Sequence, residues 1–240
     1  MSKKILITGA NRGLGLAFVK SSLDRGYTVF AGCRIPDKAE ELQELENNFK
    51  ERLFIINLDP TKLDSIQRAV AEIKSKTNSL DILVNNAGIN SKSSGVDPAI
   101  HLQLGKLQAE PMLAMFHLNA IAPIIMAQEF LELLGESGKG RVINISSWFA
   151  SLSIPQKGNY TYSASKTALN MLTKILANDL AKLNIISFTV NPGWMKTDMG
   201  GKSANLEPTE SAKSILEFSE KLKIEDSGKF FNHDGSEHPW

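Results

Sequence analysis

The sequence has little cysteine and almost no excess of charge of either sign. Cys33 is the only cysteine, so an intramolecular disulfide is impossible, which fits a reducing compartment. Lysine and arginine number 27 against 26 for aspartate and glutamate, which gives a net charge of +1. Non-specific binding to a phosphate backbone requires a strong positive field. We therefore expect no nucleic-acid partner.

Long apolar runs are also missing. A transmembrane helix needs about 18 uninterrupted apolar residues, and the longest candidate, Met112 to Leu134, is broken by polar residues and a proline. The interrupting residues are His117, Asn119, Pro123, Gln128 and Glu129. Near the N-terminus, the run Ile5 to Ile7 is far shorter than the apolar region of a signal peptide. We therefore expect a cytoplasmic protein with no membrane partner.

Two patterns alternate along the chain. Short apolar runs rich in β-branched residues predict strands, and they occur at Lys4 to Thr8, Tyr27 to Gly32, Leu53 to Asn57, Ile82 to Asn85, Arg141 to Ser146 and Ile185 to Asn191. Segments of helical character lie between them, including Leu14 to Arg25, Lys38 to Lys50, Leu63 to Lys76, Met112 to Leu134 and Ser163 to Lys182. This alternation is typical of a parallel sheet covered on both faces, because parallel strands need crossover helices.

The length of 240 residues suits one unit of this kind. We therefore predict an α/β fold, a single doubly wound Rossmann-type domain over residues 1–240, with a parallel sheet of about seven strands. Two segments, Asn90 to Gln108 and Trp194 to Pro208, are longer than ordinary connectors and are expected to border a substrate site. The C-terminal end carries a short apolar run, Phe230 and Phe231, and then a polar tail that we expect to be solvated.

The first predicted strand leads directly into a glycine-rich turn. Glycines let the backbone approach a pyrophosphate, and the helix that follows directs its free N–H groups and positive dipole end at the anion. The spacing departs from G-x-G-x-x-G, so a plain glycine turn is the alternative. The residues assigned to a nucleotide here are Gly9, Asn11, Arg12, Gly13, Leu14 and Gly15.

The end of the second strand indicates which nucleotide. A site for NAD usually has a carboxylate there for the ribose 2′-hydroxyl, whereas a 2′-phosphate needs an arginine. Arg34 stands at this point, and no acidic residue lies between Ala31 and Pro36. Arg12 can supply a second guanidinium to the same phosphate. The alternative for either arginine is a solvated surface charge, and together they favour NADPH.

The third and fourth strands end in further residues of the same cleft. Leu58 and Asp59 follow the third strand, and Asp59 is either an acceptor for the adenine amino group or a helix N-cap. The fourth strand ends in Asn85, whose amide can tie neighbouring strands, and then in Asn86, Ala87 and Gly88, which allow close backbone approach. Residues 1–90 are thus expected to bind mainly cofactor, and 91–240 to supply catalytic and substrate-side elements.

Tyr162 and Lys166 are spaced i, i+4 in a helical segment, so their side chains lie on one face. Carbonyl reduction by hydride leaves an alkoxide that must be protonated, and a phenol of pKa about 10 is a sluggish acid near neutrality. An adjacent ammonium lowers the pKa of such a phenol, and Lys166 can supply it. Tyr160 has Ala164 at the equivalent spacing and is not a candidate.

Two polar residues complete the candidate catalytic set. Ser147 follows the fifth strand, where a hydroxyl can hydrogen-bond a substrate oxygen, or it is only a strand-end cap. Asn119 interrupts a long apolar helix, where a buried amide is costly without partners. It either anchors a water leading to Lys166 or satisfies a helix irregularity near Pro123.

Jointly, these residues resemble the short-chain dehydrogenase/reductase family over essentially the whole chain. The shared motifs are T-G-x-x-x-G-x-G, N-N-A-G, Asn119, Ser147, Tyr162, Lys166 and Pro192-Gly193, in the family's order. Arg34, Tyr160 to Ser163, Pro192 to Met199 and the ending Asp234 to Trp240 are similar to the C-factor and sniffer group of carbonyl reductases.

The resemblance implies a role for each matching residue. Ser147 orients substrate, Tyr162 transfers the proton, Lys166 also holds the nicotinamide ribose, and Asn119 joins the proton relay. Pro192, Gly193, Met195 and Thr197 border the cofactor, with Thr197 at the nicotinamide end. Ser147 precedes Tyr162 by more residues than in many members, which leaves Ser151 open as the substrate-orienting hydroxyl.

The sequence therefore predicts an NADPH-dependent oxidoreductase that reduces a ketone, aldehyde or quinone carbonyl to an alcohol. The alternative is an NADPH-binding sensor with little turnover. A metal site at His233, Asp234, Glu237 and His238 would lack a rigid element, and no serine has the G-x-S-x-G setting of a hydrolase. A sugar-nucleotide epimerase would need an extra domain.

The two long helical segments are apolar around much of their circumference. Met112 to Leu134 and Ser163 to Leu183 cannot direct every apolar side chain at one sheet, because successive helical residues lie about 100° apart. We therefore expect a homodimer or a homotetramer built from it. The alternative is a monomer in which Asn90 to Gln108 covers the same face.

Overall fold

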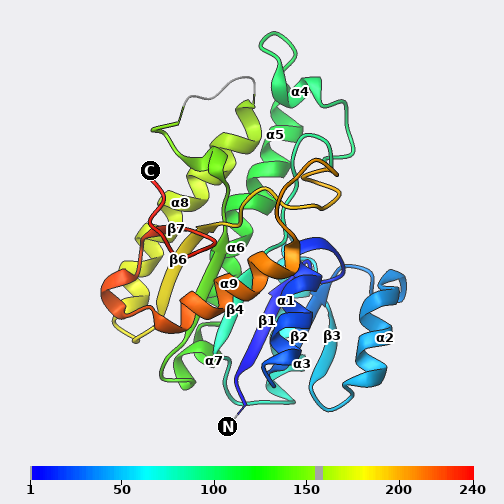
Figure 1. The fold of residues 1–240 in the computed structure, drawn as a ribbon, viewed down its shortest axis with the longest axis vertical. Coiled ribbons are helices and arrows are strands. Elements are labelled where there is room, and N and C mark those ends of the chain that lie inside the picture. Colours follow the sequence, from blue (N-terminus) through cyan, green and yellow to red (C-terminus); the bar gives the residue numbers. More distant parts are fainter. Residues whose placement is uncertain (1, 155–158) are drawn as a thin grey trace.

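The computed structural model describes residues 2–154 and 159–240. Within them, one parallel sheet has the strand order β3-β2-β1-β4-β5-β6-β7 (Figure 1). The strands are β1 (Lys4–Thr8), β2 (Thr28–Cys33), β3 (Leu53–Asn57), β4 (Ile82–Asn85), β5 (Arg141–Ile145), β6 (Ile186–Asn191) and β7 (Phe230–Asn232). The order reverses between β1 and β4, and such a switch point is where doubly wound sheets bind their ligands. The predicted fold class is confirmed.

Helices cover both faces of the sheet. They are α1 (Gly13–Asp24), α2 (Glu40–Asn48), α3 (Leu63–Lys74), α4 (Ala99–Leu102), α5 (Ala109–Phe116), α6 (Ala122–Glu129), α7 (Leu131–Glu136), α8 (Tyr160–Ala181) and α9 (Pro208–Lys221). Ile5 and Ile7 of β1 pack into one core with α1, α2 and α9, whereas Leu6 between them packs into a second core with α3, α6 and α7. Successive strand residues point to opposite faces, so strands covered on both faces are continuously apolar.

The segment 112–134, predicted as one helix, is divided into several elements. A π-helical turn, His117–Ile121, separates α5 from α6. Pro123 has no N–H to give to the carbonyl of Asn119, so a regular α-helix cannot run through this point. The irregularity near Pro123 that the sequence allowed is present within one helical segment, Ala109–Glu129, and α7 follows it as a separate short helix.

By length and composition alone, Ala109–Glu129 could cross a membrane, with a mean hydropathy of 1.3. In the fold, its residues pack beside α8, and Met126 and Ala127 belong to the core beneath the sheet. Within the fold, 33% of this apolar window is buried.

The two long segments take different courses. Asn90 to Gln108 contains α4, whose fully buried His101 lies with Nδ1 3.1 Å from Oγ1 of Thr161 at the start of α8. The segment after β6 folds back on itself through a bridge between Met195 and Leu206, and α9 then begins at Pro208.

The C-terminal tail is not solvated throughout, as the sequence had led us to expect. His238 is only 3% exposed, and its backbone N–H donates to the carbonyl of Phe230 in β7. The prediction failed because the tail pairs with the edge strand β7, and its polar composition does not indicate this pairing.

Candidate active site

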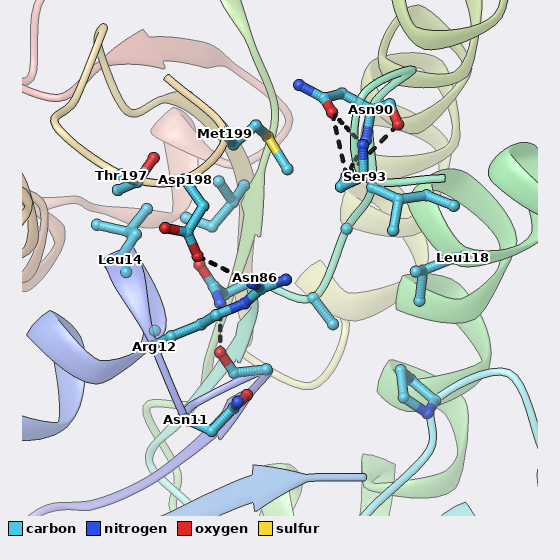
Figure 2. Close-up of a pocket in the computed structure, with 18 of the residues that line it drawn as sticks. Asn11, Arg12, Leu14, Asn86, Asn90, Ser93, Leu118, Thr197, Asp198 and Met199 are labelled. Carbon is cyan, nitrogen blue, oxygen red and sulfur yellow. Dashed lines mark hydrogen bonds and ion pairs between the residues drawn. The ribbon is translucent and has the colours of Figure 1, made fainter. Parts of the chain in front are cut away.

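A cleft of about 530 Å³ lies at the carboxyl ends of the central strands. Pockets of this size are typical of small-molecule and cofactor sites. Figure 2 shows Asn11, Arg12 and Leu14 of the glycine turn near Thr197, Asp198 and Met199, with Asn90, Ser93 and Leu118 on the opposite wall. The predicted residues on its lining are Gly9, Asn11, Arg12, Gly13, Leu14, Gly15, Arg34, Leu58, Asp59, Asn86, Ala87, Gly88, Tyr162, Lys166, Pro192, Met195 and Thr197. Gly193 does not line the cleft and lies against Leu206 and His233.

The glycine turn has the geometry of an anion site. Gly9 and Gly13 have φ of 64° and 54°, in the left-handed region that favours glycine. Asn86 fixes the turn, because its Nδ2 donates to the carbonyl oxygens of Thr8 at 2.9 Å and Gly9 at 3.1 Å. The first turn of α1 holds no acidic residue. Its N–H groups and positive dipole end are therefore available to a phosphate.

The two predicted arginines both line the cleft, but only Arg12 forms an ion pair within the described residues. Within the described residues Arg34 forms no ion pair, so its guanidinium is free for a ligand. Arg12 pairs with Asp198 at 2.9 Å, and the two side chains are 67% and 81% exposed. Exposed pairs of this kind contribute about 1 kcal/mol or less. A ligand phosphate can therefore compete for Arg12 at little cost.

Asp59 lies in a turn ahead of α3. Its Oδ1 accepts from Thr61 N at 3.0 Å and from Thr61 Oγ1 at 2.7 Å. The N-cap of α3 is Lys62, so the N-cap alternative for Asp59 is wrong. Asp59 still lines the cleft, and its N–H donates to Ser65.

Tyr162 and Lys166 lie in the first two turns of α8 and reach the cleft together. The Lys166 side chain is 4% exposed, and its Nζ donates to the carbonyl of Ile145 at 2.7 Å. Burial lowers the pKa of Lys166 to about 8. Burial raises the pKa of Tyr162, and a hydrogen bond with Ser147 opposes that rise. We expected a lowered Tyr162 pKa, and the direction here is the opposite, because desolvation of the phenolate dominates.

Ser147 and Ser151 are distinguished by their partners. The Ser147 hydroxyl lowers the pKa of Tyr162 by a side-chain hydrogen bond, and its Oγ accepts from Phe149 N at 3.3 Å. Ser151 is buried, and its Oγ accepts from Ser153 N at 3.2 Å. Ser147 is not among the residues that line the cleft, whereas its buried neighbour Ser146 is. The geometry therefore favours Ser147 as the hydroxyl that acts with Tyr162.

Comparison with known proteins identifies the family. The family model for short chain dehydrogenases matches residues 3–207. The chain belongs to this family. It is 32% identical to an uncharacterized oxidoreductase of Schizosaccharomyces pombe, over 98% of this chain and 96% of the relative. It is 33% identical to C-signal of Myxococcus xanthus, over 68% of this chain and 95% of the relative.

Solved structures of carbonyl reductases share the fold of this short-chain dehydrogenase. The NADPH-bound carbonyl reductase from chicken fatty liver has a TM-score of 0.90 and 33% identity, covering 100% of this chain and 99% of its own. Carbonyl reductase Sniffer of Drosophila melanogaster has a TM-score of 0.92 and 34% identity, covering 100% of both chains.

In this short-chain dehydrogenase, Asn119 connects the segment after β4 with α8 through hydrogen bonds. Its side chain is fully buried, with Oδ1 accepting from Ile89 N at 2.9 Å and Nδ2 donating to Ile89 O at 2.8 Å and to Ser165 Oγ at 3.1 Å. A Cβ added to Gly88 would meet Asn119 Oδ1 at 3.2 Å and Lys166 Nζ at 3.5 Å. Asn119 therefore ties the backbone after β4 to α8, and it lies behind the lining close to Lys166.

Several lining residues were not assigned from the sequence. They are Cys33, Pro60, Thr61, Ile89, Asn90, Lys92, Ser93, Leu118, Ile145, Ser146, Asp198 and Met199. Asn90, Lys92 and Ser93 belong to the long segment expected to border the substrate site, so the signal was its length. Asp198 and Met199 lie in the motif that resembles carbonyl reductases, but nothing in their residue type indicated the cleft.

Proposed function

We propose that the chain is an NADPH-dependent carbonyl reductase that converts a ketone, aldehyde or quinone carbonyl to an alcohol. The observation that supports this most directly is that Tyr162 and Lys166, one helical turn apart on α8, line the same cleft as the glycine turn and Arg34. NADP-bound carbonyl reductases among the similar structures support the same cofactor. We also propose a cytoplasmic location.

The cleft suits a dinucleotide with a 2′-phosphate. Gly9 and Gly13 take left-handed backbone conformations and carry no side chains, which leaves the backbone beside the α1 N-terminus accessible to a phosphate. Arg34, with Arg12 nearby, supplies the cation that a 2′-phosphate requires, and no carboxylate stands at the end of β2. Lys166 and Tyr162 would hold the nicotinamide end. When bound, NADPH supplies the hydride.

The side chains supply the proton and hold the substrate oxygen. Ser147 donates a hydrogen bond to the carbonyl oxygen, which steadies the negative charge that develops there. Tyr162 gives its phenolic proton to that oxygen, which becomes the hydroxyl of the product. Protonated Lys166 then stabilises the phenolate left on Tyr162. With Lys166 at a pKa of about 8, a large share of the chains carry this ammonium at neutral pH.

The test is turnover of NADPH with a panel of carbonyls, including an aromatic diketone, a quinone and an aliphatic aldehyde. We expect at least one aromatic carbonyl to be reduced at a catalytic rate, with an alcohol as the product. Tight NADPH binding without reduction of any member of the panel would contradict the proposal. It would favour an NADPH-binding sensor instead.

We also propose that the protein is a homodimer or a tetramer built from it. Leu113 and Ile121 on α5 and the adjoining π-helical turn, and Met171 and Ile175 on α8, are exposed although these elements are neighbours. The short helix α4 contacts both α5 and α8, and these four side chains remain exposed beside it. Light scattering during gel filtration tests this, because a mass near 26.3 kDa would contradict the dimer.

A further inference from the structure

The C-terminal segment, residues 233–240, returns along the edge strand β7. Asn232 N donates to Ser236 O and His238 N donates to Phe230 O, both at 2.8 Å, and Phe231 pairs antiparallel with Glu237. Figure 1 shows this end of the chain beside β7 and α8. The segment therefore covers an edge that would otherwise present unpaired backbone groups.

Two side chains of this segment hold it against the rest of the protein. The His238 ring stacks on Phe230 with centroids 4.5 Å apart and meets the Trp148 ring edge-on at 5.1 Å. The Trp240 ring lies 5.9 Å from Phe230 and beneath the Lys174 ammonium of α8 at 5.0 Å. Aromatic pairs with this geometry contribute beyond the area they bury.

His238 and Trp240 also contact one loop, residues 147–153. Trp148 directly follows Ser147, and Ser153 donates from its backbone N to the main-chain oxygen of Trp240 at 2.9 Å. Thr167 of α8 fixes the middle of the loop, because its Oγ1 donates to Ala150 O at 2.8 Å. The C-terminal segment thus contacts both ends of the loop, and Thr167 holds its centre. Asn191 of β6 also holds the first end, because its Oδ1 accepts from Trp148 N at 3.0 Å.

We propose that His238 and Trp240 are positioning residues for the substrate-orienting hydroxyl of Ser147, a role that rests on the proposed function. The His238 ring acts through Trp148, and the Trp240 ring, held by Phe230 and Lys174, fixes the main-chain oxygen that accepts from Ser153. Neither residue lines the cleft. Loss of either ring frees the loop on the side that the C-terminal segment holds. A hydroxyl displaced by about 1 Å loses up to about a hundredfold in rate, because the reacting atoms must be aligned.

The role of His238 depends on its ring. Nδ1 contacts only Pro239 O, its own neighbour, at 2.9 Å, and within the described residues Nε2 has no hydrogen-bond partner. A phenylalanine offers the same face and edge to Phe230 and Trp148. The substitution His238→Phe is therefore expected to keep the loop in place, whereas His238→Ala is not.

The experiment compares Trp240→Ala and His238→Ala with the wild type in three measurements. We expect kcat/KM for the carbonyl to fall about tenfold, while the Kd for NADPH, measured by fluorescence, stays within about twofold. Hydrogen exchange of the backbone amides in 147–153 should rise, with no change in β1 and β4. His238→Phe and Trp240→Phe should return kcat/KM and the hydrogen exchange of 147–153 to wild-type values.

Glu237→Gln is the matched control from the same segment. Glu237 faces the other way, with its carboxylate 3.0 Å from Lys229, so this variant should match the wild type in all three measurements. Unchanged exchange in 147–153 in both alanine variants would overturn the proposal, and so would a phenylalanine variant as impaired as the alanine one. If the wild type reduces no carbonyl, the proposed function fails, and the exchange measurement alone then decides whether the segment holds the loop.

Discussion

Gly15 is the position in the cleft where a single methyl group has the most predictable effect. A Cβ at Gly15 would lie 2.1 Å from Gly9 O and 2.7 Å from Asn86 Nδ2, whereas ordinary contacts begin at 3.4 Å. Relief of the first contact requires a displacement of about 1 Å between α1 and the end of β1. The new methyl group is fixed to the α1 backbone, and Gly9 O belongs to the backbone after β1, so neither can rotate away. Gly15→Ala therefore separates the two elements that form the glycine turn.

The magnitude follows from the size of this overlap. Overpacking by one methyl group costs about 1–3 kcal/mol, which lowers the Tm of a domain of this size by about 2–12 °C. We expect NADPH affinity to fall at least about tenfold, the equivalent of about 1.4 kcal/mol, because the Gly9 and Asn86 groups that shape the turn are moved.

Gly26→Ala separates the loss of stability from the loss of binding. Gly26 has φ of 77° with nothing within 4 Å of an added Cβ, so alanine there costs only the left-handed strain of about 1–2 kcal/mol. Thermal melts and NADPH titration of both variants form the assay. Gly15→Ala that binds NADPH as tightly as Gly26→Ala would refute the reasoning.

Three further predictions concern the cofactor and the catalytic groups. Ser147→Ala should lower kcat/KM for the carbonyl about a hundredfold, and Ser151→Ala far less, and steady-state kinetics giving the reverse order would reassign the hydroxyl. Arg34→Ala should raise the KM for NADPH at least about tenfold, and adding Cys33→Asp should shift preference toward NADH; a wild type that uses NADH equally well would contradict the assignment. The pKa of Lys166 is lowered to about 8, so its ammonium is lost as pH rises through that value. The pH profile of kcat/KM should accordingly decline above about pH 8, and a profile flat to pH 10 would exclude Lys166 as the group that titrates.

The strands were predictable because they are apolar on both faces, and much of the cleft lining was predictable because its residues follow those strands. The six strands expected from the sequence match the observed ones to within one residue at each end, since each is apolar on both faces. The glycine turn, Arg34 and the pair Tyr162 and Lys166 lie at strand ends or in the helix that follows. Their spacing along the chain therefore predicts their proximity in space.

Features that depend on tertiary partners were not predictable from the sequence. Asn119 lies in a π-helical turn and forms hydrogen bonds with Ile89 and Ser165, and residue periodicity indicates none of these. The ion pair of Arg12 joins residues 186 positions apart in the chain. His238 appeared to be part of a polar tail, because its burial depends on Phe230 and Trp148 lying beside it.

The central claim is that Tyr162 gives the proton in carbonyl reduction. Tyr162→Phe removes that hydroxyl and keeps the ring, so we expect reduction of an aromatic diketone to fall below a few per cent of wild type while NADPH affinity stays within severalfold. Tyr160→Phe, altered two residues away on another face of α8, should keep full activity. Single-turnover oxidation of bound NADPH measures this directly. Retention of substantial activity by Tyr162→Phe, with loss in Tyr160→Phe, would contradict the account.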